Sequence, residues 1–161
     1  MNFKTKNPPM KTSHERSYKR LLTLHIALII VSLTAIITRA LIPVIEGGTW
    51  SPENMFKTFL MLAIGAGVSV LIELVYSIGE GTSHEFKDYK RIVDPINTGL
   101  IIALLLPIST PIYVLILAVG VGVYAGKIVY GGYGHYIFNP ALVGVLFATI
   151  SFDSVLSYGD T

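Results

Sequence analysis

The chain contains no cysteine and few charged residues. Without a thiolate among its 161 residues, it can neither form a disulfide nor supply cysteine ligands to an iron–sulfur cluster. Charged residues make up 14% of the chain, against about 25% in an average soluble domain, whereas 52% of its residues are hydrophobic. The composition therefore indicates a membrane protein, and any cysteine-bound metal centre must belong to a partner chain. We expect no metal site in the chain itself.

The few basic residues are gathered at two places. Of the 12 basic residues, six precede the first apolar run and three lie in one later polar stretch, namely Lys4, Lys6, Lys11, Arg16, Lys19 and Arg20, then Lys87, Lys90 and Arg91. This asymmetry follows the positive-inside rule of membrane proteins and does not indicate nucleic-acid binding. It predicts a multi-pass protein of the inner (plasma) membrane, with the N-terminus and the polar stretch 79–93 on the cytoplasmic side.

Apolar runs separated by proline and glycine predict about five transmembrane segments. The first is 21–42, which we expect Pro43 to end, and the second is 57–77. The run 96–126 is too long for one helix, so Pro107 and Pro111 divide it into a short third segment and a fourth, and a fifth starts at Ala141. The predicted class is an all-α polytopic fold, compatible with one half of an inverted repeat. We expect residues 1–20 to form a basic cytoplasmic segment, 21–157 the transmembrane domain and 158–161 a truncated outer tail.

The stretch 127–141 is rich in glycine and aromatic residues and almost uncharged. Gly131, Gly132 and Gly134 permit backbone conformations that a Cβ hinders, and Asn139 with Pro140 opens the next helix. Irregular backbone at membrane depth is tolerated only inside protein, so we expect this loop to be packed. Its N–H groups either cradle an anionic ligand or form a tight turn between close helices, and the turn is the simpler interpretation.

Two motifs, in order along the chain, point to a known family. They are Asp94-Pro-Ile-Asn-Thr-Gly-Leu-Ile-Ile-Ala-Leu-Leu-Leu-Pro107 and Ala125-Gly-Lys-Ile-Val-Tyr-Gly-Gly-Tyr-Gly-His-Tyr-Ile-Phe-Asn-Pro-Ala141. Across residues 60–155 the chain resembles the NqrB/RnfD family, which are membrane flavoprotein subunits of the sodium-pumping NADH:quinone reductase and of the Rnf ferredoxin:NAD oxidoreductase. The residues at 135 and 136 depart from the family pattern, and the short loop with Asp94 favours the Rnf type.

The resemblance implies an FMN in the full-length protein, attached through its phosphate to a threonine in a Ser/Thr-Gly-Ala-Thr motif. The chain instead ends in Tyr158-Gly-Asp-Thr161, so Thr161 is a weak match and we expect no covalent FMN here. Family members are longer and have a second helical half, so we expect this chain to be the N-terminal half. Riboflavin or another flavin is left open. The candidate cofactor-binding residues are Lys127, Gly131, Gly132, Gly134 and Asn139.

Lys127, at the end of the fourth segment, has two interpretations. Its positive charge could neutralise a reduced flavin or a cofactor phosphate. It could instead be an anchor that snorkels to the inner membrane surface, as the positive-inside rule favours. Both interpretations stay open on the sequence.

Four polar residues are candidates for a cation path, namely Glu73, Asp94, Asn97 and Thr98. An ionisable side chain at the bilayer centre costs about 2.5–3.5 kcal/mol, so it marks a functional site by default. The resemblance also associates a carboxylate in this second segment with cation entry. Simpler interpretations are that Glu73 snorkels towards Lys87 or Lys90, and that Asp94 caps the third helix with Pro95 in its first turn.

We therefore expect an RnfD-like membrane subunit of an ion-translocating electron-transport complex. It would couple flavin-mediated electron transfer to sodium or proton movement, with the other membrane subunits and the lipid bilayer as partners. The alternative is half of a urea- or ammonium-type transporter or channel without a redox role. Bound flavin in the full-length protein would discriminate between the two.

Overall fold

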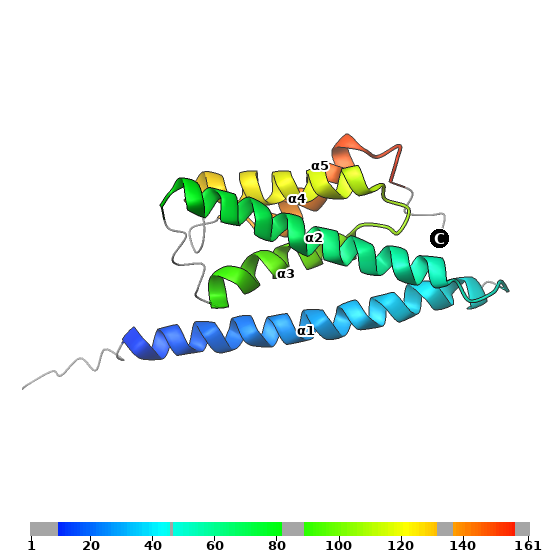
Figure 1. The fold of residues 1–161 in the computed structure, drawn as a ribbon, viewed down its shortest axis with the longest axis horizontal. Helices are drawn as coiled ribbons and strands as arrows, with labels where there is room; N and C mark the ends of the chain where they lie inside the picture. Colours follow the sequence, from blue (N-terminus) through cyan, green and yellow to red (C-terminus); the bar gives the residue numbers. More distant parts are fainter. Residues whose placement is uncertain (1–9, 46, 82–88, 132–136, 157–161) are drawn as a thin grey trace, which may run out of the picture.

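The computed structural model describes residues 10–45, 47–81, 89–131 and 137–156, which form five α-helices and one short 3-10 helix. They are α1 (Met10–Ile45), α2 (Pro52–Gly79), α3 (Tyr89–Leu105), α4 (Ile112–Gly126), η2 (Ile128–Tyr130) and α5 (Pro140–Ser151). α1 lies along one side of the bundle, α4 and α5 lie on the opposite side, and α2 and α3 pass between them (Figure 1). The most extensive helix contacts are those of α2 with α3 and of α4 with α5.

Three stretches of helix are long and apolar enough to cross a membrane, namely Tyr18–Ile45, Pro52–Gly79 and Ile112–Tyr130. α3 has 17 residues and α5 has 12. At 1.5 Å per residue they are about 26 and 18 Å long, against a hydrocarbon core of about 30 Å. Apolar side chains of α1 such as Ile30 and Leu33 are exposed, as a lipid-facing surface requires. The predicted all-α polytopic class is confirmed, and so is the short third helix.

α1 extends past Pro43 to Ile45, so the prediction that this proline ends the helix is wrong. Pro43 has no N–H to donate to the carbonyl of Arg39, four residues earlier. The side-chain amide of Asn54 donates to that carbonyl instead, with Nδ2 and O 3.5 Å apart. A partner from the next helix thus replaces, weakly, the hydrogen bond that proline removes. The helix tolerates Pro43 because it ends within the same turn.

α2 begins at Pro52, earlier than the predicted boundary at Lys57. Ser51 is the N-cap, and its hydroxyl accepts a hydrogen bond from the backbone N–H of Asn54 at 3.3 Å. Pro52 follows at the first helical position and Glu53 lies in the first turn, where a negative charge is favourable. Hydropathy misses this start because the capping residues are polar.

α3 begins at Tyr89, so Asp94 and Pro95 lie inside the helix and the prediction that Asp94 caps it is wrong. Two contacts hold the extra turn in place. The ring of Tyr89 packs edge-to-face on Tyr18 of α1, with centroids 6.0 Å apart. Val93 is buried. Burial of this apolar surface stabilises a helical turn that Pro95 would otherwise disfavour.

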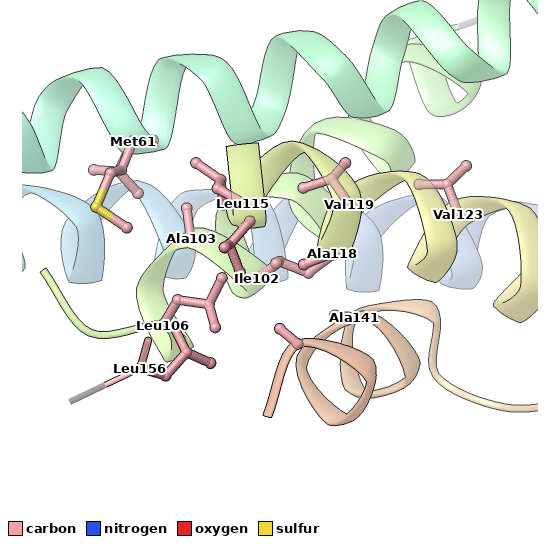
Figure 2. Packing of buried hydrophobic residues seen from close by; sticks show 13 residues of the cluster. Met61, Ile102, Ala103, Leu106, Leu115, Ala118, Val119, Val123, Ala141 and Leu156 are labelled. Carbon is pink, nitrogen blue, oxygen red and sulfur yellow. The ribbon is translucent and has the colours of Figure 1, made fainter. Parts of the chain in front are cut away.

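The hydrophobic core lies where α2, α3, α4 and α5 meet. Ile102 of α3 and Leu115, Ala118 and Val119 of α4 are completely buried in it (Figure 2). Ala141, at the start of α5, packs into the same cluster. The polar residues described below lie on elements that this core holds together.

Glycines bring two helix pairs unusually close. A Cβ on Gly65 of α2 would lie 2.7 Å from the carbonyl oxygen of Gly99 on α3. A Cβ on Gly126, the last residue of α4, would lie 2.7 Å from the Cα of Pro140 on α5. These backbones approach one another because the glycines have no side chain, as is common in membrane helix packing. The Gly65–Gly99 contact fixes the register of α2 against α3.

Candidate ion site

Lys127 lies at the junction between α4 and η2 and turns into the bundle. Its backbone N–H donates to the carbonyl of Val123 at 3.1 Å and closes α4. The side chain is only 1% exposed. Lys127 is therefore a buried cation and does not snorkel to the membrane surface, so the anchor interpretation is wrong. The alternative role in cofactor binding stays a prediction.

Two carboxylates from different helices share the ammonium group of Lys127. Its Nζ donates to Oε2 of Glu73 on α2 at 2.6 Å and also to Oδ2 of Asp94 on α3. Glu73 is 3% exposed and Asp94 is 14% exposed. Three residues from three separate elements thus form one buried charge cluster. We call Lys127, Glu73 and Asp94 the charge cluster.

The partner of Glu73 differs from the predicted one. The sequence offers Lys87 or Lys90 as partners of a snorkelling glutamate, whereas the buried Glu73 pairs with Lys127. Lys87 lies outside the described residues. The interpretation as a snorkelling side chain is wrong, because the Glu73 side chain points into protein that also buries Lys127.

The charge cluster does not satisfy every polar atom. Oε1 of Glu73 is buried and has no hydrogen-bond partner among the described residues. One turn earlier on the same face of α2, Oγ of the buried Ser69 has none either. Buried polar atoms without a partner are rare in folded proteins, and an unseen water or ion commonly explains them. α2 therefore presents two unsatisfied oxygens beside a lysine that two carboxylates share.

Asn97 and Thr98 follow Asp94 on α3 and have different contacts. The Thr98 hydroxyl donates to the Asp94 carbonyl at 3.1 Å, so it serves the helix backbone. The Asn97 Oδ1 lies 2.6 Å from Nδ1 of His25 on α1, and this oxygen accepts if that ring nitrogen carries the proton. The Asn97 Nδ2 is then left buried without a partner among the described residues.

The contact between His25 and Asn97 was not predicted from the sequence. The only signal was a polar ring in an apolar helix, and such a ring needs a hydrogen-bond partner when it is buried. Which residue supplies that partner depends on how α1 packs against α3, and this cannot be read from spacing. The partner of His25 lies 72 positions away along the chain.

A cavity of about 610 Å³ adjoins the charge cluster. It lies between the first half of α1, the first half of α3 and the segment that leads into α5. The lining includes Arg20, Asp94, Asn97, Thr98 and Asn139, together with apolar side chains. Of the three residues in the charge cluster, only Asp94 lines the cavity. Asp94 therefore connects the cavity with the buried pair of Lys127 and Glu73.

The glycine-rich loop is described only in part. Gly131 has φ of 102° and donates its N–H to the carbonyl of Ile128 at 2.9 Å, which is a tight turn that favours glycine. Asn139 is the N-cap of α5, where its Oδ1 accepts from the N–H of Ala141 at 3.0 Å. Gly132 and Gly134 lie outside the described residues. Both described candidates thus have local structural roles.

Arg39 is a second cation held by the bundle. Its Nη2 donates to the carbonyls of Leu104 and Leu106, at 3.1 and 3.0 Å, where α3 ends. The sequence does not indicate these partners, because backbone acceptors leave no pattern in it. Arg39 joins α1 to the last turn of α3.

The fold and site together define a polytopic helical membrane protein that contains a buried, shared lysine–carboxylate cluster beside a cavity. The chain belongs to the NQR2, RnfD, RnfE family, whose model matches residues 5–159. This confirms the family resemblance of its two motifs.

Several curated relatives are named as subunits of an ion-translocating oxidoreductase complex. The protein of Haemophilus influenzae strain PittEE is 34% identical over 113 residues, covering 64% of this chain and 32% of the relative. That of Actinobacillus succinogenes is 34% identical over 113 residues, with the same coverage. A Salmonella paratyphi A protein is 32% identical over 115 residues, covering 70% and 31%. The chain thus spans about a third of the length of these relatives.

Proposed function

We propose that this chain is part of an RnfD-like membrane subunit of an ion-translocating electron-transport complex. The observation that carries the proposal is the buried sharing of Lys127 by Glu73 and Asp94 beside a cavity. Ionisable residues inside membrane helices are costly and are typical of ion pathways. The names of the relatives, which describe components of ion-translocating oxidoreductase complexes, support the same function. Other subunits of such a complex and the lipid bilayer are its partners.

The cavity provides the entrance of the proposed cation path. A sodium ion or proton that enters it meets Asp94, the member of the charge cluster that lines it. Asn97 and Thr98 line the same cavity. The next carboxylate is Glu73, which Lys127 joins to Asp94. Oxygen ligands of this kind suit hard cations.

The charge cluster belongs on the cytoplasmic side in this proposal. Arg20 lines the same cavity as Asp94, and Lys19 and Arg91 lie in the neighbouring turns of α1 and α3. Basic residues collect on the cytoplasmic side of inner-membrane proteins. The N-terminus of the chain then lies in the cytoplasm, and cations enter the cavity from there.

The described candidate residues do not fit a flavin cradle. Lys127 is held by two carboxylates, which would repel a flavin phosphate. Gly131 forms a turn and Asn139 caps a helix. We therefore assign no described residue to a flavin. A flavin in the full-length protein, which would carry the electrons, stays a prediction from the family, as does the absence of covalent FMN on Thr161.

The transporter alternative has no observation in its favour among the described residues or the relatives. The family assignment favours the redox-linked subunit. The two functions differ in whether ion movement requires electron transfer, and this sets the experiment.

The test is cation uptake into membrane vesicles that contain the assembled complex with the full-length protein, driven by electron transfer. Glu73→Gln removes a charge but retains shape, and we expect it to abolish most uptake while assembly stays normal. Glu73→Asp, with the charge on a shorter stem, keeps part of the activity. Glu53→Gln in the exposed first turn of α2 is the matched control and leaves uptake unchanged. Wild-type uptake by Glu73→Gln would rule out the assignment.

A further inference from the structure

The charge cluster places two carboxylates around one ammonium group. Two carboxylates share the single ammonium of Lys127, and Oε1 of Glu73 is left without a partner among the described residues. Arg91, on α3, adds a Coulomb attraction on Glu73. A buried carboxylate oxygen without a hydrogen-bond partner favours the approach of a further cation or of the water bound to it.

The positions of the three residues determine which contact an entering cation meets first. Asp94 lines the cavity, whereas Glu73 and Lys127 lie behind it. A cation that approaches Asp94 must displace or share the contact of this carboxylate with Lys127. Lysine suits such an exchange, because its ammonium is a compact charge on a flexible stem. If Lys127 leaves Asp94, the ammonium still retains Glu73 as a partner.

We infer that Lys127 is a tethered cation that competes with the transported ion for Asp94, and so sets the affinity of the entrance for that ion. The inference rests on the proposed function. When an alkali metal ion or a proton takes Asp94, Lys127 still pairs with Glu73.

Two unpaired groups beside the path support an ion or its hydration shell at this place. Oγ of Ser69 on α2 and Nδ2 of Asn97 on α3 are buried without a partner among the described residues, and both lie between the charge cluster and the contact of Gly65 with Gly99. Water bound to an entering cation satisfies donors and acceptors alike. Neither group has a structural role that the described contacts explain.

The experiment measures the half-saturating ion concentration of electron transfer in the assembled complex. Sodium is titrated at fixed pH with choline as the replacement, and where turnover needs no added sodium, the proton concentration is titrated instead. Lys127→Gln removes the competitor, so we expect a half-saturating concentration about tenfold lower, which corresponds to a modest binding energy. The arginine of Lys127→Arg can bind both carboxylates through its several N–H donors. We therefore expect this variant to have a higher half-saturating concentration than the wild type.

Lys19→Gln removes a positive charge from an exposed site and is the matched control, with no shift expected. A purely structural lysine predicts lower assembly or a lower maximal rate at an unchanged half-saturating concentration, and that result in the Lys127 variants overturns the inference. If Lys127→Gln fails to assemble, the Lys127→Arg variant decides. An unchanged half-saturating concentration in that variant contradicts the competition, and a raised one supports it.

Failure of the inference is distinguishable from failure of the proposed function. If Glu73→Gln stops cation uptake but neither Lys127 variant shifts the half-saturating concentration, the path stands and the competition is rejected. If Glu73→Gln transports like the wild type, the path itself is rejected.

Discussion

Lys127 and Arg39 are two cations held by the same bundle, with different kinds of partner. The Arg39 guanidinium donates to the backbone carbonyls of Leu104, in the last turn of α3, and of Leu106, just after that helix, and these carbonyls carry partial charge. The Lys127 ammonium donates to two carboxylates that carry full charge on separate helices. Backbone carbonyls accept hydrogen bonds from a donor and so fix the end of the helix. Two carboxylates with full charge can bind one cation in place of another. The two cations therefore differ in the chemistry of their partners, and in the proposed function only Lys127 takes part in ion exchange.

The largest loss of stability is expected when the positive charge of the charge cluster is removed. Lys127→Met removes the ammonium from the buried Glu73 and from the partly buried Asp94, and we expect it to lower the free energy of unfolding by about 3–5 kcal/mol. Thermal unfolding of the purified protein in detergent measures the change. Lys19→Met on the exposed side of α1 should shift it by less than about 0.5 kcal/mol. A small effect of Lys127→Met would mean that the carboxylates are not ionised together, and the contrast with Arg39 would fail.

An intermediate effect is expected at Arg39. Arg39→Met leaves the carbonyls of Leu104 and Leu106 without their donor, which should cost about 1.5–3 kcal/mol because a charged group makes both hydrogen bonds. The same unfolding measurement applies, and Arg39→Lys should recover part of the loss. Ion dependence of the assembled complex should not change in either variant. A shift in half-saturating ion concentration would show that Arg39 also belongs to the path.

The smallest effect is expected at the other contact between α1 and α3. His25→Leu removes the hydrogen bond to Asn97 and should cost about 0.5–1.5 kcal/mol. His25→Gln, which retains a donor, should lose less. Unfolding of both variants in one detergent separates the hydrogen bond from packing. Equal losses would show that the ring contributes by packing alone.

Much of the fold was predictable from the sequence because membrane helices are recognisable by length and hydropathy. The all-α class, the apolar segments and the family motifs came from composition and pattern. The sequence did not predict the helix boundaries near Pro43, Pro52 and Tyr89. At Pro52 the reason is local, because Ser51 caps the helix, whereas at Pro43 and Tyr89 a contact with another helix decides, through the Asn54 amide and the ring of Tyr18.

The candidate site divides in the same way. Sequence reasoning identified Glu73 as a costly membrane carboxylate and Asp94 as either a helix cap or part of a cation path, but it assigned Lys127 to an anchor or a cofactor. The pairing depends on how α2 packs against α3, whose closest approach is at Gly65 and Gly99. On α2, Glu73 lies eight positions after Gly65, and on α3, Asp94 lies five positions before Gly99. In an antiparallel helix pair these offsets, about 12 and 8 Å at 1.5 Å per residue, bring the two carboxylates to similar depth.

The sequence by itself determined that this chain enters a membrane, that it is helical, and which side chains are too polar for lipid. Only the tertiary structure decided which of them meet. The partners of Lys127 lie 54 and 33 positions away, and the rotation of α2 and α3 about their axes selects them. Hydropathy records the cost of burying a charge at its own position. It holds no information on the opposite charge that offsets this cost, because that charge arrives only when the helices pack.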